Sequence, residues 1–226
     1  MSAPPGSSSM SSLAPRLLLH VLTDCAMSGG RSEEEMAAAA LAGGATVVQL
    51  RRKDVAGDEL VRIGRRLRAL TRAAGALLIV NDDVEVALAI DADGAHVGQS
   101  DMPATRSRSL LGPHRLLGVS ASTVEEAVHA AAAGADYIGF GPIFSTSSKS
   151  DASAPTGLVG LRAACHVVPT PIVAIGGITT QSVPGVIRAG ATGIAVIAAV
   201  VAAPDMEEAA RELRRAVEDA VREVKS

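Results

Sequence analysis

Aromatic residues are almost absent from this 226-residue chain, which has no Trp, one Tyr and two Phe. Three aromatic side chains cannot build the stacking surface on which proteins bind single-stranded nucleic acid. The formal net charge of −3 at pH 7 also provides no strong positive field for nucleic acid or for an anionic membrane. The composition therefore argues against both kinds of partner.

Cysteines and long apolar runs are also scarce. The only two cysteines, Cys25 and Cys165, cannot form a disulfide framework or a Cys-rich zinc site, so we expect a reducing, cytoplasmic location. The longest uncharged apolar stretch spans the 16 residues 189–204. A membrane-spanning helix needs about 20 residues, so none is expected.

The first fifteen residues carry no charge and consist mostly of Ser, Pro, Ala and Gly. They lack the basic start and apolar run of a signal peptide and the Arg content of a mitochondrial transit peptide. We therefore expect residues 1–15 to be a disordered leader and residues 16–226 to form a single folded domain.

A repeated pattern organises that domain: a helical segment ends in Gly, Ala follows, and a short apolar run comes next. Gly at the end of a helix supplies the left-handed backbone conformation without steric cost. These glycines stand at 44, 75, 134 and 190, so their spacings are 31, 59 and 56 residues. The spacings are close to one or two lengths of a strand–helix unit of about 30 residues.

Eight apolar segments are predicted strands, and helical patterns separate most of them. The strands are expected at residues 17–23, 46–51, 77–81, 93–97, 115–119, 136–140, 171–175 and 192–197. Capping boxes at 32–35 and 123–126 open two helices, and further helices are expected at 58–74, 84–90, 179–189 and 205–224. Short strands that are apolar on both faces are typical of a parallel sheet covered on both sides.

Eight such units in about 210 residues predict an α/β fold of the (β/α)8 TIM-barrel type. A doubly wound open sheet is the alternative, but no G-x-G-x-x-G motif follows the first predicted strand. We therefore favour the barrel.

In a parallel barrel the chemistry gathers where the strands end. Gln49, Arg51 and Lys53 alternate along the second predicted strand and its end, so their side chains share one face. A cationic pair at this position would bind phosphate, and an amide inside the apolar run VVQL is costly unless it has a partner. Arg52 and Asp54 are expected to form solvated ion pairs instead.

Two carboxylates, Asp82 and Asp101, follow the third and fourth predicted strands and should meet at the same rim. Mg²⁺ prefers hard oxygen ligands of this kind and keeps several waters, so the pair predicts a magnesium site. A helix cap is the alternative role for such a residue, and we expect Asp83 to have that role.

Other features allow two interpretations. His96 ends an apolar strand and could be a buried packing histidine, whereas His20, His114, His129 and His166 show no ligand spacing and are assigned no role. The Gly-Gly-Ile segment at 176–178 precedes a predicted helix, a position at which backbone amides bind phosphate. The polar loop 144–157 is either an ordinary surface loop or a lid that brings Lys149 onto a phosphate.

These motifs resemble, in order and spacing from about residue 17 to 200, the thiamine-phosphate synthase family. The resemblance rests on LTD (22–24), VVQLRRKD (47–54), NDD (81–83), ADGAHVGQSD (92–101), GVS (118–120), DYIGFGPIFSTSSK (136–149) and IVAIGGI (172–178). It implies that a hydroxymethylpyrimidine diphosphate is joined to hydroxyethylthiazole phosphate in a Mg²⁺-assisted reaction. In that family pyrophosphate leaves first and the thiazole nitrogen then attacks a pyrimidine-methyl cation.

The resemblance also implies residue roles. Arg51, Lys53, Asn81 and Lys149 match the pyrophosphate ligands, and Asp82 and Asp101 match the Mg²⁺ ligands. Gln49, His96, Gly98, Ser120 and Thr146 match positions that recognise the pyrimidine and line the reacting centre. Gly177, Ile197 and Ala198 match those that hold the thiazole phosphate, and the catalytic role falls to Arg51, Lys53, Ser120 and Lys149.

Two positions depart from the family pattern. Ala198 stands where the family commonly has Ser, which predicts weaker binding of the thiazole phosphate. Ser122 stands where related thiazole tautomerases use a histidine for proton transfer, and Ser is a poor base without a partner. A tautomerase-like isomerase and a non-catalytic sensor of phosphate ligands remain the alternatives, and the oligomeric state, a homo-oligomer included, stays open.

Overall fold

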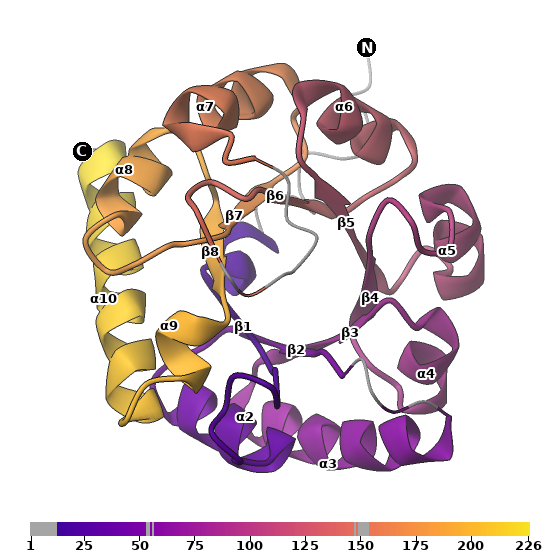
Figure 1. The fold of residues 1–226 in the computed structure, drawn as a ribbon. Coiled ribbons are helices and arrows are strands. Elements are labelled where there is room, and N and C mark those ends of the chain that lie inside the picture. The colour runs from indigo at the N-terminus through magenta and orange to yellow at the C-terminus, as the bar shows by residue number, and fades with distance from the viewer. Residues whose placement is uncertain (1–12, 53–54, 56, 147, 149–153) are drawn as a thin grey trace.

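The eight strands of the protein form one closed parallel barrel, in which each strand pairs with the next and β8 pairs with β1. The computed structural model describes residues 13–52, 55, 57–146, 148 and 154–226. Figure 1 looks along the barrel and shows the strands as a central ring inside a ring of helices. The predicted (β/α)8 barrel is confirmed.

The strands are short and the helices vary widely in length. The strands are β1 (Leu19–Leu22), β2 (Val47–Leu50), β3 (Leu77–Asn81), β4 (Gly94–Val97), β5 (Leu116–Ala121), β6 (Tyr137–Phe140), β7 (Ile172–Ile175) and β8 (Gly193–Val196). A 3-10 helix, η1 (Ala14–Leu17), precedes them. The α-helices are α2 (Glu33–Ala42), α3 (Asp58–Ala74), α4 (Val84–Ala89), α5 (Ala104–Leu111), α6 (Val124–Ala132), α7 (Gly157–Val167), α8 (Val183–Arg188), α9 (Ala198–Val201) and α10 (Met206–Lys225).

Local sequence signals placed most element ends correctly. Seven strands lie within their predicted ranges, and only β5 extends beyond its range, to Ala121. The capping box at Ser32 is present in full. At α6, Thr123 caps the helix, but Glu126 bonds to the Ser122 amide, so the reciprocal half of that predicted box is wrong. Residues 1–12 of the predicted leader lie outside the described residues, whereas Ala14 and Pro15 belong to η1.

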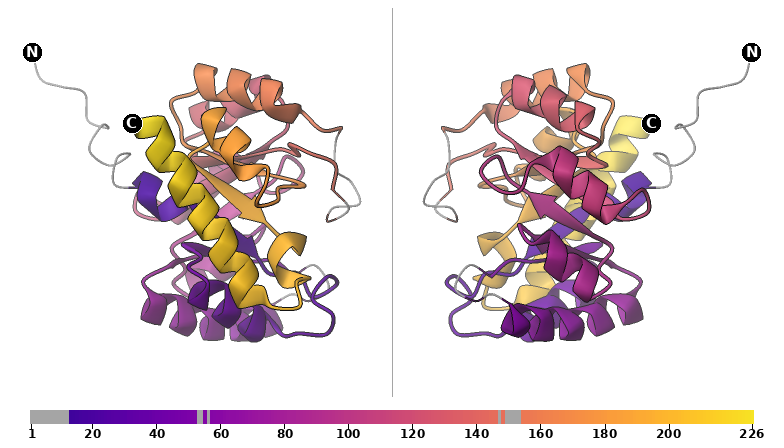
Figure 2. Two further views of the ribbon diagram at one scale, coloured as in Figure 1. Left: turned by 90° about the vertical axis from the view of Figure 1, so that its left-hand side faces the viewer. Right: turned by 90° about the vertical axis from the view of Figure 1, so that its right-hand side faces the viewer.

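Helix α10 packs along the outside of the barrel against α8 and α2, as Figure 2 shows. Its buried side chains recur every three or four residues, as an amphipathic helix requires. They are Ala210, Leu213, Val217 and Ala220. Val224, which the sequence pattern places on the same stripe, is exposed. Of the helices in the described part of the chain, none has the length and apolarity needed to cross a membrane.

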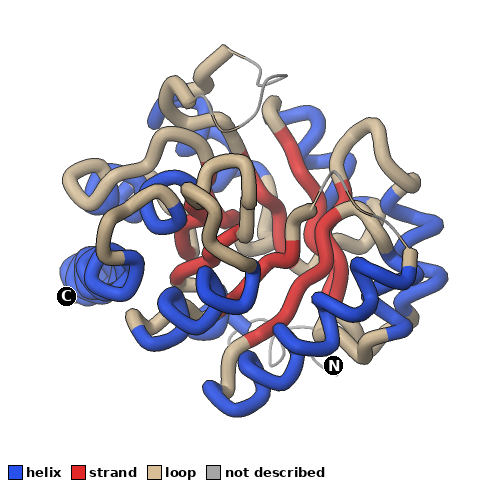
Figure 3. The backbone as a smooth tube through the Cα atoms, turned by 60° about the horizontal axis from the view of Figure 1, so that its bottom comes forward, coloured by secondary structure: helices blue, strands red, loops and turns tan. Residues whose placement is uncertain are grey.

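A repeated pair of hydrogen bonds, here called the polar clamp, joins neighbouring strands at the amino-terminal end of the barrel. Thr46, Asp93 and Asp136 each stand immediately before an even-numbered strand, and each side chain accepts a hydrogen bond from a backbone amide of the preceding strand, at 2.7–3.0 Å. The backbone amide of the same residue donates to the carbonyl of that preceding strand, at 2.8–3.0 Å. Figure 3 shows the strands as the inner layer of the fold. The clamps join neighbouring strands of this layer.

The clamp yields a stability prediction. Asp136 accepts from the Leu117 amide at 2.7 Å and pairs with Arg108. Asp136→Ala leaves that amide without its acceptor and should lower the free energy of unfolding by about 1–3 kcal/mol. Asp136→Asn keeps an acceptor oxygen and should cost less. Urea unfolding of both variants measures the difference, and equal losses would contradict the clamp.

Candidate active site

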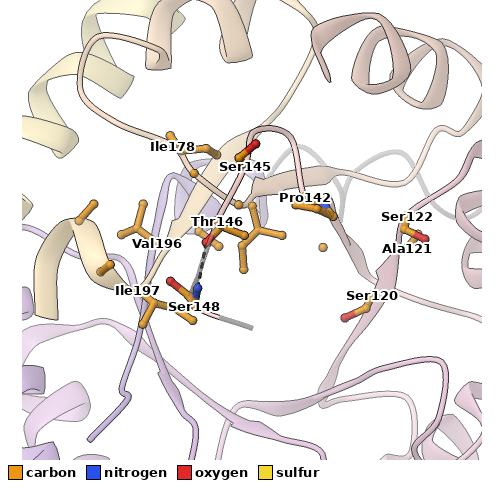
Figure 4. Close-up of a pocket in the computed structure, with 18 of the residues that line it drawn as sticks. Ser120, Ala121, Ser122, Pro142, Ser145, Thr146, Ser148, Ile178, Val196 and Ile197 are labelled. Atoms are coloured by element: carbon orange, nitrogen blue, oxygen red, sulfur yellow. Dashed lines mark hydrogen bonds between the residues drawn. The ribbon is translucent and has the colours of Figure 1, made fainter. Parts of the chain in front are cut away.

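A pocket of about 610 Å³ opens at the carboxyl ends of β5 to β8. Figure 4 shows Ser120, Ala121 and Ser122 on one side of it and Ile178, Val196 and Ile197 on the opposite side. The loop after β6 contributes Pro142, Ser145, Thr146 and Ser148. Glu126 is the one charged side chain among the described residues that line the pocket.

The wall formed by the ends of β7 and β8 contains the predicted phosphate-binding residues. Gly177, Ile197 and Ala198 all line the pocket. Gly177 has a φ of +64°, and a Cβ on it would lie 2.5 Å from the carbonyl oxygen of Ser145, so no other residue fits this close approach. The start of the helix predicted at 179–189 is wrong, because the observed helix, α8, begins four residues later, at Val183. The short helix that does adjoin the wall is α9, which the sequence analysis missed.

A second, smaller cavity of about 30 Å³ lies inside the barrel. It shares Ser120, Gly139, Ile175 and Ala195 with the large pocket, so it lies against the base of that pocket. Its polar lining consists of His20, Gln49, Asn81, His96, Ser120 and Tyr137. The structure thus gathers Gln49, Asn81, His96 and Ser120, four of the predicted site residues, around this interior cavity.

His96 stands at the centre of a hydrogen-bonded line that crosses the barrel interior. Its Nε2 lies 2.9 Å from Ser120 Oγ and its Nδ1 lies 3.2 Å from the Tyr137 hydroxyl. Tyr137 in turn is hydrogen-bonded to Gln49, and burial raises the pKa of its phenol despite that bond. His96 is thus a buried histidine with both ring nitrogens hydrogen-bonded, which is compatible with the packing role and also brings its ring against the base of the pocket.

Glycines make this line possible. A Cβ on Gly118 would lie 2.3 Å from His96 Nδ1 and 2.4 Å from the Tyr137 hydroxyl. Because real Cβ contacts are far longer, any larger residue on this inward face of β5 would displace both rings.

Arg51 lies buried beside Asp24, and the two side chains form an ion pair. The hydroxyl of Thr23 accepts from the Arg51 amide at 3.0 Å, which fixes the backbone at the end of β2. A buried charge without a partner is expensive, so Asp24 holds the guanidinium in one position at the mouth. Arg52 forms an ion pair with Glu33 in a partly buried position, whereas Asp54, its expected companion, lies outside the described residues.

The two predicted metal ligands follow neighbouring strands. Asp82 is exposed and has a φ of +67°, a left-handed backbone that Asp adopts more readily than most residues and that often marks a functional position. Asp101 Oδ2 accepts from the Gly98 amide at 2.7 Å, so Gly98 orients this carboxylate. Asp83 caps α4 through the Val86 amide, as predicted.

These donors suit a partly hydrated Mg²⁺ in kind, since both are carboxylates on adjacent loops. No group of three or more His, Cys, Asp or Glu residues with metal-binding geometry occurs in the parts of the chain that are described. A Mg²⁺ ion held by two carboxylates would have its other coordination positions free for waters and substrate oxygens. Lys53 and Lys149, both predicted phosphate ligands, lie outside the described residues.

Five residues that lie at the mouth or around the interior cavity were not among the predicted site residues. They are His20, Asp24, Gln99, Glu126 and Tyr137. Asp24 and Tyr137 belong to the motifs LTD and DYIGF, and strand alternation would have directed Tyr137 inward. Gln99, whose Nε2 donates to the Ser120 carbonyl at 2.6 Å, and Glu126 on α6 follow no local pattern.

The buried His20 yields a pH prediction. Burial is the main cause that lowers the pKa of His20 from 6.5 to about 3, and a proton on nearby His96 would oppose protonation of His20 further. Below pH 6.5 the unfolded chain therefore binds a proton that the folded protein does not bind. As the pH falls from 6 to 4, His20 should therefore lower the free energy of unfolding by about 1.4 kcal/mol for each pH unit. In His20→Phe, urea unfolding over the same range should show a slope shallower by that amount; an unchanged slope contradicts the assignment.

Comparison with known proteins shows which family the sequence of this barrel matches. A family model described as thiamine monophosphate synthase matches residues 19–200. The chain is 52% identical over 203 residues to a thiamine-phosphate synthase of Moorella thermoacetica, covering 90% of this chain and 97% of the relative. It is 55% identical over 199 residues to that of Chloroflexus aurantiacus, covering 88% and 92%.

A solved structure agrees with the sequence relatives. The thiamine phosphate pyrophosphorylase of Pyrococcus furiosus superimposes with a TM-score of 0.85 and 42% identity, covering 92% of this chain and 99% of that one. Both the sequence and the fold lead to one conclusion: the chain belongs to the thiamine-phosphate synthase family of transferases.

Proposed function

We propose that this protein transfers the pyrimidine-methyl group of hydroxymethylpyrimidine diphosphate to the nitrogen of hydroxyethylthiazole phosphate and releases pyrophosphate. The observation that carries this function is a division of charge around the barrel mouth. Arg51, Asp82 and Asp101 follow β2 to β4, whereas Glu126 is the one charged residue among the described residues that line the large pocket at the ends of β5 to β8. One half therefore suits a diphosphate with its cation, and the other suits the uncharged thiazole ring of the acceptor.

On the charged half, the positioned guanidinium of Arg51 is the strongest support. The ion pair with Asp24 fixes it before any ligand arrives, so little side-chain entropy remains to be lost on binding. Negative charge builds on the leaving oxygens when the diphosphate departs. Preplaced cations stabilise that transition state more than the ground state. Lys53 and Lys149 remain predicted partners of Arg51 in this role.

Asp82 and Asp101 would hold Mg²⁺ at the same rim. When bound, the ion would neutralise charge on the diphosphate oxygens and so ease departure of the leaving group. The chain's own contribution is orientation: the Gly98 amide holds one oxygen of Asp101, and the left-handed backbone at Asp82 fixes where its side chain begins.

At the reacting centre, the line from Tyr137 through His96 to Ser120 provides polar groups without net charge. Ser120 borders both cavities, so its hydroxyl can contact a ring bound at the base of the large pocket. Substrates that fill this pocket would displace water, and water is the competitor that would capture a carbocation before the thiazole nitrogen does.

The acceptor half is the half of the mouth that would bind the thiazole phosphate. Its lining includes Gly177, Ile197 and Ala198, with Thr146 on the loop after β6. A backbone amide of Ala198 can donate to a phosphate oxygen as well as that of Ser can, whereas the methyl group cannot add a side-chain hydrogen bond. This difference predicts a functional site with reduced affinity for the thiazole phosphate.

One observation favours an isomerase as the second candidate. Glu126 lines the large pocket and accepts from both the amide and the hydroxyl of Ser122, at 2.6 and 2.9 Å. A carboxylate there could accept a proton from a bound ring, although both hydrogen bonds from Ser122 occupy its Oε2. An isomerase of this kind needs no metal.

The test is chromatographic detection of thiamine phosphate from both purified substrates with Mg²⁺, repeated with EDTA. Product that disappears with EDTA supports the synthase. Isomerisation of a thiazole substrate that continues in EDTA, without any thiamine phosphate, would replace it with the second candidate.

A matched pair of variants tests the carboxylate roles. Asp101→Ala should lower kcat/KM by about 100-fold, because charge stabilisation of the leaving group is lost. Asp83→Asn retains the oxygen that caps α4 and should leave kcat/KM within about twofold. Both are assayed at saturating Mg²⁺ with circular dichroism as a check of folding. Equal kcat/KM in the two variants would contradict the assignment of Asp101 as a metal ligand.

Ala198→Ser tests the acceptor half. A new hydroxyl contact should lower KM for the thiazole phosphate by about two- to tenfold and leave kcat unchanged. Ala202→Ser, at the exposed end of α9, is the matched control and should leave KM unchanged. An unaltered KM in Ala198→Ser contradicts the placement of the phosphate.

A further inference from the structure

The imidazole of His20 has a nitrogen that no described residue satisfies. His20 Nε2 is fully buried and has no hydrogen-bond partner among the residues that the structure describes. A buried polar atom in this state costs about 1–3 kcal/mol. The side chain of His20 lines the small interior cavity, so the cavity is the place where a partner can be found.

The cavity has the size and lining of a water site. Its volume of about 30 Å³ exceeds the ~10–15 Å³ that one ordered water needs, and it is far too small for a substrate ring. A buried water requires two to four polar partners. Polar side chains reach this cavity from β1 to β6, whereas apolar side chains from β7 and β8 close its other side.

His20 also contacts the line of hydrogen bonds that leads to the large pocket. Its ring lies 5.3 Å from the Tyr137 ring, centroid to centroid. The line then continues from the Tyr137 hydroxyl through His96 to Ser120. A neutral histidine can occur in either of two tautomers, so the protons of this line can be arranged in two opposite directions.

The chemistry of the Tyr137–His96 pair favours one of these directions. A phenol hydroxyl is a stronger hydrogen-bond donor than a neutral imidazole N–H, and an unprotonated imidazole nitrogen is a stronger acceptor than a phenolic oxygen. Tyr137 then donates its own proton to His96 Nδ1. His96 must in consequence carry its proton on Nε2 and donate it to Ser120 Oγ, which leaves the Ser120 proton available to the large pocket.

We propose that the interior cavity holds one water bound to His20 Nε2, and that His20 is a positioning residue that keeps His96 in the Nε2–H tautomer. The water supplies the partner that His20 lacks and joins it to the polar groups of Gln49 and Tyr137. Ser120 therefore faces the large pocket as a hydrogen-bond donor. The tautomer assignment does not depend on the substrate, whereas its effect on turnover rests on the proposed function.

The experiment is long-range ¹H–¹⁵N NMR of the imidazole nitrogens in the full chain, with three variants. Wild type should show His96 protonated at Nε2. His20→Phe removes the anchor of the water and should give a second His96 tautomer, with kcat lower by about two- to tenfold and KM little changed. His20→Gln keeps a polar group at the cavity and should restore the single tautomer.

Val173→Ala is the matched control, because Val173 lines the same cavity and carries no polar group. It should loosen packing without changing the His96 tautomer, which separates loss of packing from loss of the anchor. An unchanged tautomer in His20→Phe, or a change of equal size in Val173→Ala, overturns the proposal.

A crystal structure of the wild type at high resolution tests the water directly, even where His20→Phe does not fold. Density within hydrogen-bond distance of His20 Nε2 supports the proposal, and an empty cavity overturns it. If the wild type makes no thiamine phosphate but shows the expected tautomer and water, the proposed function fails while the water site stands.

Discussion

Closure of the barrel between β1 and β8 is the constraint on which the rest of the structure depends. Backbone pairing of Leu19 with Ile194 and of Val21 with Val196 joins the first strand to the last. With every strand parallel, all eight carboxyl ends then meet at one mouth. Residues as far apart in sequence as Arg51 and Ala198 can form one site only because this closure brings their strands into a single ring.

A closed ring of eight strands has an interior that side chains must fill, and this protein fills part of it with polar rings. In many barrels branched apolar residues occupy these layers. Here Gly118 and Gly139 leave space into which His96 and Tyr137 extend. Polar groups inside a core are tolerated when they are hydrogen-bonded to one another, and they then hold a single arrangement. The interior cavity thus adjoins the pocket at the mouth, where we propose that residues of the core and of the mouth contact the same ligand.

The fold was predictable from the sequence because its signals are local. Gly at the helix ends, Ser32 with Glu35 at a helix start, and short runs of apolar residues each depend on neighbours within a few positions. The side chains that end the strands could be placed on the mouth for the same reason, since the direction of a parallel strand determines where its end lies.

The rest depends on partners that local patterns do not specify. Asp24 and Arg51 are 27 residues apart, and nothing in either segment shows that they pair. Glu126 stands at the position that completes a capping box. Its carboxylate instead accepts a hydrogen bond from the amide of Ser122, the residue before the cap, and it lines the pocket. The role of His20 depends on a cavity to which all eight strands contribute, and a cavity of that kind exists only in the assembled barrel.

The proposed function divides the mouth into a charged half for the diphosphate and a half for the thiazole phosphate that has one charged residue, Glu126, among its described lining. A crystal structure of the protein with thiamine phosphate, pyrophosphate and Mg²⁺ tests this most directly. We expect pyrophosphate beside Arg51, with the metal between Asp82 and Asp101, and the phosphate of thiamine phosphate against Gly177 and Ala198. The reverse arrangement, with pyrophosphate in the large pocket, would contradict the account.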